Sequence, residues 1–263
     1  MKVSVITPSI RPEGLEIVAN SLSKQSFKDI EWLICGPEIN REKVLEVVGG
    51  IFPPIYIGNP PLKEGMFWDL NYSYNRLIKK ATGDIIVTWQ DWIYANRDAL
   101  EKFVKNVEDT GGVVSGVGDQ YLKLNKYGKP ELKVWGDCRK TDRYGSFYAC
   151  NWNDAEFNFA AFPRELAYRV GGFDEKLDFL GVGGDQLQFC ERLNDIGVTF
   201  YLDQSLESFT LRHDRSDFGG QEEWDSKHVL FKKGKSGMSF YDERKLELKQ
   251  SGQWPILTYL TNR

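Results

Sequence analysis

A chain of 263 residues with 41% hydrophobic residues is long enough for one large domain with a substantial core, or for one domain with an extension. Its net charge of −4 argues against nonspecific binding to nucleic acid. The four cysteines form no Cys-x-x-Cys pair and there are only two histidines, which argues against a zinc site and favours free thiols.

The first part of the chain predicts strands that alternate with helices. We expect strands at 3–7, 31–35, 54–58, 84–89 and 112–116, and helices at 14–24, 41–48, 69–81 and 96–109. Such alternation predicts an α/β fold with a mostly parallel sheet and helices on both faces. Ligands of these sheets bind beyond the carboxyl ends of the strands.

The segment 121–153 is polar and aromatic and includes a hairpin-like turn at 125–128, so we expect a β insertion or a loop over the site. An apolar strand then leads from Phe159 into a helix. After Asp203 the pattern weakens, with a loop expected at 214–220 and a helix at 222–232. We expect no membrane-spanning segment and no signal peptide, and therefore a cytoplasmic protein.

A glycine loop that ends on a carboxylate is the most informative local feature of the chain. Gly181-Val182-Gly183-Gly184-Asp185 precedes a predicted helix at 187–193, which places Asp185 at a helix N-terminus. A carboxylate there is suited to meet a substrate hydroxyl. The alternative is that Asp185 only caps the helix.

Several blocks resemble family 2 glycosyltransferases of the GT-A fold. The opening Val3–Ser9, the block Ser21–Phe27 with Glu31–Ile34, Asn75 with Ala81–Val87, and the run from Phe162 to Glu175 occur in the family's order. The resemblance implies a Rossmann-like GT-A sheet, a small β insertion and a C-terminal helical tail. It covers 1–215, with a nucleotide-sugar-binding half at 1–118 and an acceptor-side half at 119–215, and leaves 216–263 as an extension.

The family transfers a sugar from a nucleotide-diphosphate donor, expected here to be a UDP-sugar, to an acceptor hydroxyl on a glycan, a lipid-linked molecule or another compound. The implied donor-binding residues are Thr7, Pro8, Ser9, Arg11, Glu38, Asn75, Gln90, Asp91 and Trp92. Glu38 is included because Gly36-Pro37-Glu38 stands where the family has an Asp pair that reads the base. An ordinary turn is the alternative there.

The family's Asp-x-Asp metal motif is incomplete in this chain. Gln90-Asp91-Trp92 keeps one carboxylate, so Mn²⁺ or Mg²⁺ is expected to bind through Asp91, the diphosphate and water. The resemblance implies that His213 is a second metal ligand. The alternatives are a structural His213 and cationic groups, Arg212 and Arg215, that hold the diphosphate.

The catalytic block also departs from the family pattern Gly-x-Gly-Gly-Glu-Asp. Its last two positions are Asp185 and Gln186 here, and Gln cannot accept a proton, so Asp185 is the expected base of an inverting reaction. If Asp185 only orients the acceptor, the enzyme is retaining or inactive. Trp152, Asp154, Gly184 and Gln186 are the expected acceptor-binding residues.

Two rival functions follow from these departures. The first is a noncatalytic nucleotide- or sugar-binding protein on the same fold, because a fold does not fix a function. The second is a transferase acting on nucleic-acid bases, which the acidic composition disfavours. The basic run 232–235 is typical of a solvated face and is also compatible with peripheral contact to an anionic membrane.

Overall fold

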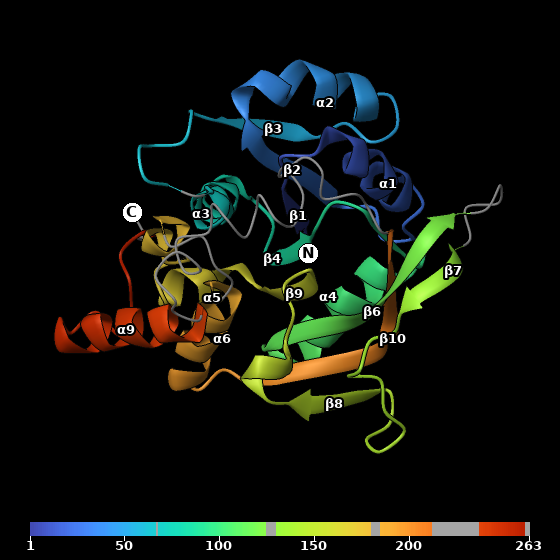
Figure 1. Ribbon diagram of the computed structural model, residues 1–263. Coiled ribbons are helices and arrows are strands. Elements are labelled where there is room, and N and C mark those ends of the chain that lie inside the picture. The colour runs from blue at the N-terminus through green and yellow to red at the C-terminus, as the bar shows by residue number, and fades with distance from the viewer. Residues whose placement is uncertain (67, 125–129, 180–184, 212–236, 261–263) are drawn as a thin grey trace.

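The computed structural model describes residues 1–66, 68–124, 130–179, 185–211 and 237–260. A ten-stranded sheet lies between two layers of helices (Figure 1). The strands are β1 (Val3–Pro8), β2 (Ile30–Pro37), β3 (Ile55–Asn59), β4 (Ile85–Trp89), β5 (Ile93–Ala95), β6 (Val113–Leu124), β7 (Pro130–Trp135), β8 (Phe147–Cys150), β9 (Phe159–Pro163) and β10 (Phe200–Leu211). The α-helices are α1 (Pro12–Ser23), α2 (Arg41–Val48), α3 (Leu70–Lys80), α4 (Ala99–Thr110), α5 (Arg164–Arg169), α6 (Asp185–Asp195) and α9 (Gly237–Gln250), with short 3-10 helices η1 (Glu38–Asn40), η2 (Trp152–Asp154) and η3 (Glu175–Phe179).

The sheet is parallel in its first half and mixed in its second. Strands β3, β2, β1 and β4 are parallel neighbours in that order. Strand β9 then pairs antiparallel with both β4 and β6, and β10 runs parallel to β6. The α/β fold class is therefore confirmed. Parallel pairing is limited to these two groups of strands, because β9, which lies between them, runs in the opposite direction to both of its neighbours.

Each face of the sheet carries its own core. Val3, Val5 and Val87 pack with helices α1, α2 and α4 on one face. Ile6 and Ile86 pack with α3, α5 and α6 on the other face. Because both faces are covered, β1 is buried up to Thr7 and β4 over its whole length, and both are mostly apolar, as expected for buried parallel strands.

The sequence predicted most elements up to residue 116 within a few residues, and the strand at 159–163 and the helix at 185–195 are also present. The β6–β7 pairing confirms the expected hairpin, although its turn at 125–129 lies outside the described residues. Strand β5 was missed, and β10 continues to Leu211 although the pattern weakens after Asp203. The loop expected at 214–220 and the helix expected at 222–232 also lie outside the described residues.

The described C-terminal residues pack closely on the acceptor-side half. Arg244 of α9 forms an ion pair with Asp174, and the backbone N–H of Leu257 donates to the Val170 carbonyl at 2.9 Å. Gly171 has a φ of +71°, and a Cβ there would lie 1.7 Å from the carbonyl oxygen of Leu257. Glycine at 171 therefore permits the close approach of the C-terminal residues; the boundary at 215 stays a prediction.

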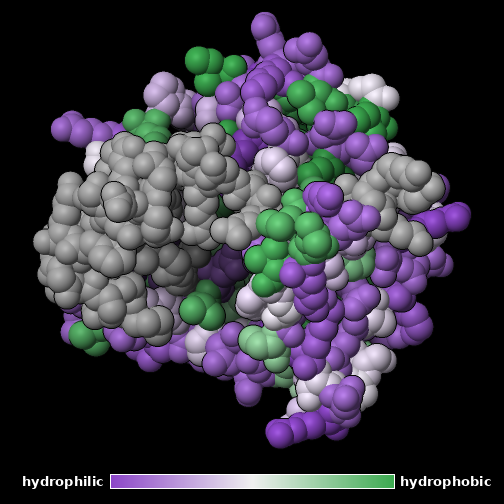
Figure 2. Space-filling model, turned by 45° about the vertical axis from the view of Figure 1, so that its right-hand side comes forward, coloured by the Kyte–Doolittle hydropathy of each residue, from purple (hydrophilic) through white to green (hydrophobic). Residues whose placement is uncertain are grey.

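Two surface properties bear on partners. Among the described helices, none combines the length and apolar character that crossing a membrane requires. The face in Figure 2 is mostly hydrophilic, with hydrophobic residues in separate small patches. Prominent exposed apolar side chains of the β6–β7 hairpin are Leu122, Leu132, Val134 and Trp135.

Candidate functional site

The carboxyl ends of β1 and β4 bring three predicted donor-binding residues together. Because the strands are parallel neighbours, Ser9 and Arg11, which follow β1, lie next to Asp91, which follows β4. The Arg11 guanidinium donates from Nε to Oδ2 of Asp91 at 3.1 Å and from Nη2 to Oδ1 at 2.7 Å. The Ser9 hydroxyl donates to Oδ2 at 2.8 Å. We call Ser9, Arg11 and Asp91 the crevice cluster.

The side chains of the crevice cluster are largely shielded from water. The Asp91 side chain is 6% exposed and that of Arg11 is 17% exposed. The Ser9 hydroxyl also accepts the backbone N–H of Arg11 at 3.1 Å, which fixes the turn between β1 and α1. A cation, a hydroxyl and a carboxylate are thus bonded to one another at the carboxyl ends of β1 and β4, where ligands of open α/β sheets bind.

Two other predicted donor-binding side chains are buried in contacts within the protein. The Thr7 hydroxyl donates to the Trp89 carbonyl at 2.7 Å and accepts from the Trp32 indole at 3.0 Å. The Asn75 amide donates to the Phe173 carbonyl at 2.9 Å and accepts the Phe173 N–H at 2.8 Å. Both side chains support the fold, and their contact with a donor stays a prediction.

The remaining donor-side residues lie at or just after the carboxyl ends of β1, β2 and β4. Pro8 ends β1 and is half-buried, as is Gln90, whose backbone N–H donates to the Asn158 carbonyl at 3.0 Å. Glu38 is exposed and forms an ion pair with Arg41, which lowers the pKa of the Glu38 carboxyl. The structure does not bring Glu38 into the crevice cluster.

Trp92, next to Asp91 in the chain, packs against the first turn of α1. The backbone of Trp92 has a φ of 65°, which a non-glycine residue rarely adopts. A Cβ on Gly14 of α1 would lie 2.4 Å from the indole ring, so the ring lies directly against the helix backbone. Glycine at 14 is therefore required for this contact, and the indole fills the space beside α1.

The described residues do not fit a divalent ion held by Asp91. Both of its carboxylate oxygens already accept hydrogen bonds from Arg11, and one accepts a further bond from Ser9. Over the part of the chain that the structure describes, no three His, Cys, Asp or Glu side chains are grouped to hold a metal. The other expected ligand, His213, lies outside the described residues.

A second polar group at the same edge of the sheet was missed by the sequence analysis. Asn59, at the end of β3, donates to Asp69 at 2.5 Å and to the Ser73 hydroxyl at 2.6 Å. Burial raises the pKa of the Asp69 carboxyl. Asp69 and Tyr72 line a small hollow with Glu175. The sequence signal that could have revealed this group was a polar residue, Asn59, at the end of a strand. Such a residue is also common in ordinary turns.

The described acceptor-side residues lie at or near α6, on the sheet face that also carries α3 and α5. Trp152 is half-buried and packs on the core that includes α6. Asp154 accepts from the Asn151 amide at 3.3 Å, and the Gln186 side-chain oxygen accepts the Phe157 N–H at 3.2 Å. Asp185 is the first residue of α6, as the sequence predicted for a residue at a helix N-terminus. Gly184 lies outside the described residues.

Two buried aspartates hold the segments on either side of 180–184. Asp178 accepts the backbone N–H groups of Asn71 and Tyr72, each at 3.0 Å, and so caps α3. Asp174 accepts from the Gln188 amide of α6 at 3.1 Å and from Arg244. Burial acts to raise the pKa of Asp174, but Arg244 lowers it below its usual range.

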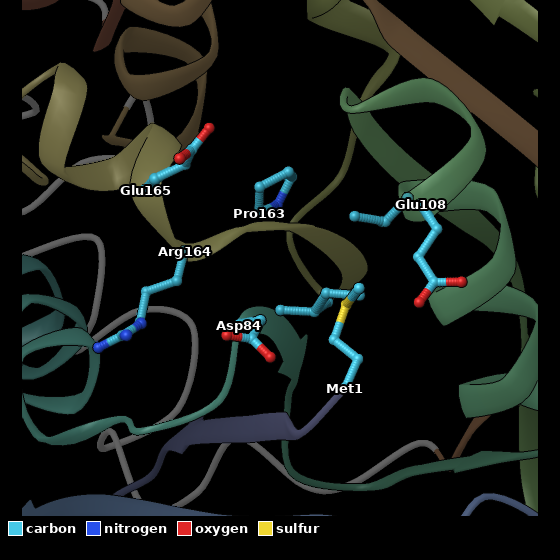
Figure 3. A pocket seen from close by; sticks show the side chains of 8 residues that line it. Met1, Asp84, Glu108, Pro163, Arg164 and Glu165 are labelled. Carbon is cyan, nitrogen blue, oxygen red and sulfur yellow. The ribbon is translucent and has the colours of Figure 1, made fainter.

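The described surface also contains a cavity at the opposite edge of the sheet. It has a volume of about 350 Å³, and Figure 3 shows Asp84, Glu108 and Arg164 around it. Asp84 immediately precedes β4, whereas Asp91 follows that strand. The cavity is therefore separate from the crevice cluster.

Comparison with solved structures identifies the fold. S. aureus TarS 1–349 in complex with UDP has a TM-score of 0.55 and 14% identity, over 88% of this chain and 66% of that one. The mannosyltransferase PcManGT from Pyrobaculum calidifontis, in complex with GDP-Man and Mn²⁺, has a TM-score of 0.56 and 17% identity, over 87% of this chain and 62% of that one. TarS 1–349 in complex with UDP-GlcNAc has a TM-score of 0.55 and 14% identity, over 81% of this chain and 59% of that one.

This chain thus spans less than two thirds of each of these solved chains. No family model and no curated protein sequence matches it. The likeness in structure, together with the sheet order and the two helical layers, shows that the chain has the GT-A fold that the sequence resemblance predicted.

Proposed function

We propose that this protein transfers a sugar from a nucleotide-diphosphate donor to an acceptor hydroxyl. The observation that carries the proposal is the crevice cluster at the carboxyl ends of β1 and β4 in a GT-A fold. The solved structures with this fold include complexes with UDP, UDP-GlcNAc and GDP-Man. A guanidinium at this edge suits the phosphates of such a donor.

The acceptor side supports the same reaction. In a single displacement, the acceptor oxygen attacks the anomeric carbon, the bond from that carbon to the diphosphate breaks, and the hydroxyl proton goes to a carboxylate. We assign the proton acceptor to Asp185, at the start of α6 and the end of the glycine loop. This chemistry inverts the anomeric configuration.

Nucleotide screening followed by turnover tests the proposal. A thermal-shift screen of UDP- and GDP-sugars identifies the donor, because selective binding raises the melting temperature. Release of the nucleoside diphosphate with a panel of hydroxyl acceptors then measures transfer. We expect Asp185→Asn to bind the donor and to lose about 10²–10⁴-fold in transfer.

The matched control for that experiment is Asp109→Asn, which makes the same chemical change on the exposed surface of α4. Equal transfer by Asp185→Asn and the control would remove Asp185 from the mechanism. Donor binding without release of nucleotide, with every acceptor tried, would favour the noncatalytic binding protein. That rival is motivated by the incomplete Asp-x-Asp motif at Gln90-Asp91-Trp92 and by Gln186, which occupies the position of the family's base.

A further inference from the structure

We infer that this protein binds the diphosphate of its donor without a divalent ion on Asp91, because Arg11 occupies the carboxylate that a metal would need. The inference rests on the proposed function, since it concerns how the same donor is held. It replaces the metal site expected from the sequence with a cationic side chain of the β1–α1 turn.

The carboxylate of Asp91 is already engaged by hydrogen bonds within the protein. Its two oxygens accept three hydrogen bonds, two from Arg11 and one from Ser9, and the side chain is 6% exposed. Mg²⁺ requires carboxylate oxygens at about 2.0–2.1 Å in near-octahedral geometry. Three of the roughly four lone-pair positions of the carboxylate are therefore taken. An ion on the remaining position would lie beside a guanidinium that cannot lose its proton, and the two positive charges would repel each other.

The residues on either side of Asp91 do not complete a metal site. Gln90 and Trp92, on either side of Asp91 in the incomplete Asp-x-Asp motif, supply no carboxylate. An indole N–H is a donor with no lone pair for a metal, and the Trp92 ring lies against Gly14. An ion at this place would therefore rely on Asp91 alone among the three residues of the motif.

The guanidinium of Arg11 is held in one orientation by Asp91. A guanidinium has five N–H groups in a rigid plane, and the hydrogen bonds to Asp91 use one on Nε and one on Nη2. These bonds fix the orientation of a positive charge at the carboxyl end of β1. A fixed guanidinium recognises phosphate oxygens by paired hydrogen bonds, which a flexible ammonium group does less well.

The alternative is that Arg11 and Asp91 only tie two loops together. In that case, nucleotide affinity would be indifferent to Arg11 once the protein is folded. The two readings differ in what Arg11→Gln does to binding, and in whether a chelator changes binding in the unmodified protein.

The experiment is titration calorimetry of UDP and GDP into the full chain, in excess EDTA and in excess MnCl₂. We expect affinities in the two buffers to agree within about twofold. Arg11→Gln should weaken binding by about 10–100-fold, as expected for loss of a charge-assisted hydrogen bond. Arg11→Lys keeps the charge but loses the planar fork, so its nucleotide affinity should lie between those of the unmodified protein and Arg11→Gln. It also provides a second variant if Arg11→Gln does not fold.

Arg97→Gln is the matched control, because Arg97 is exposed and precedes α4, away from the crevice cluster. It should bind nucleotide like the unmodified protein. Circular dichroism and melting curves establish that each variant is folded before its affinity is compared.

Three results would overturn the inference. Affinity at least tenfold higher in Mn²⁺, with that gain lost in Asp91→Asn and with bound Mn²⁺ detected by electron paramagnetic resonance, would make Asp91 a metal ligand and leave the proposed function intact. Metal-independent binding that Arg11→Gln does not weaken would reduce the ion pair to a structural role. Failure of every nucleotide and nucleotide sugar to bind in either buffer would overturn the proposed function as well.

Discussion

Arg244 of α9 and Asp174, which precedes η3, form an ion pair that is almost completely withdrawn from water. The guanidinium donates from Nε to Oδ2 at 2.7 Å, and the two side chains are 6% and 0% exposed. Asp174 also accepts hydrogen bonds from Gln188 and from the Tyr259 hydroxyl. One carboxylate thus joins α6, α9 and the C-terminal residues.

Arg244→Met should destabilise the protein by about 3–5 kcal/mol, because it leaves a buried carboxylate without its partner. Urea denaturation measures the change in the free energy of unfolding. Lys249→Met is the control on the exposed side of the same helix, where the change removes, among the described residues, a cation–π contact with Trp254 of about 0.5–1 kcal/mol. Equal losses of unfolding free energy in the two variants would show that the buried ion pair adds no more to stability than the exposed cation–π contact.

Glu31 makes stability depend on acid pH. Burial acts to raise the pKa of its carboxyl, but hydrogen bonds from Ser4, Thr82 and Lys2 lower it to about 2. Its ordinary value is 4.5, so its contribution is present above that pH and is lost as the pH falls towards 2. Glu31→Gln should therefore flatten the stability profile between about pH 5 and pH 2.

Urea denaturation at a series of pH values checks the prediction for Glu31. Glu16→Gln, an equivalent change at an exposed position of α1, is the control. The profile of the control should keep the slope of the unmodified protein. If Glu31→Gln keeps that slope too, another group is responsible for the acid sensitivity.

Gly14→Ala should destabilise the protein by about 1–3 kcal/mol, because the added methyl overlaps the Trp92 ring in a packed region. On helix propensity alone, the same change would stabilise α1 by about 1 kcal/mol. The sign of the effect in urea denaturation, with the tryptophan emission spectrum of the folded state, decides between them. Gly50→Ala is the control, since a Cβ there meets no atom within 4 Å.

Asn75→Ala should cost about 1–3 kcal/mol, because it leaves the buried Phe173 N–H without its acceptor. The contact also fixes α3 to the turn before η3, which leads into the glycine loop. Thermal and urea unfolding measure the loss. Asn20→Ala, which removes a hydrogen bond on α1, should stay within about 0.5 kcal/mol of the unmodified protein.

The sequence predicted the alternating half of the fold well because each of its elements has a local signature. Strand β1 is a short run rich in β-branched residues, and α1 begins at a proline, which suits the first turn of a helix. Strand β5 has only three residues, and β10 changes register between Asp203 and Glu207. Their pairing with each other joins distant segments, so a short window of sequence does not reveal it.

The sequence predicted where the residues of the crevice cluster lie, but it did not predict the hydrogen bonds between them. The ends of β1 and β4 marked Ser9, Arg11 and Asp91 correctly as neighbours, since parallel strands end at one edge. That Arg11 would take both oxygens of Asp91 depends on side-chain geometry across 80 residues of sequence. The same holds for Asn75, whose partner Phe173 is 98 residues away.

Strand β9 has a consequence for synthesis of the protein on the ribosome. It lies between β4 and β6, which both precede it in the chain, and it pairs antiparallel with each. A nascent chain that ends before residue 159 therefore carries two strand edges with no strand between them, and exposed edges promote aggregation. The sheet can close only after Pro163 has emerged, so the edges of β4 and β6 that pair with β9 stay open until that point of synthesis.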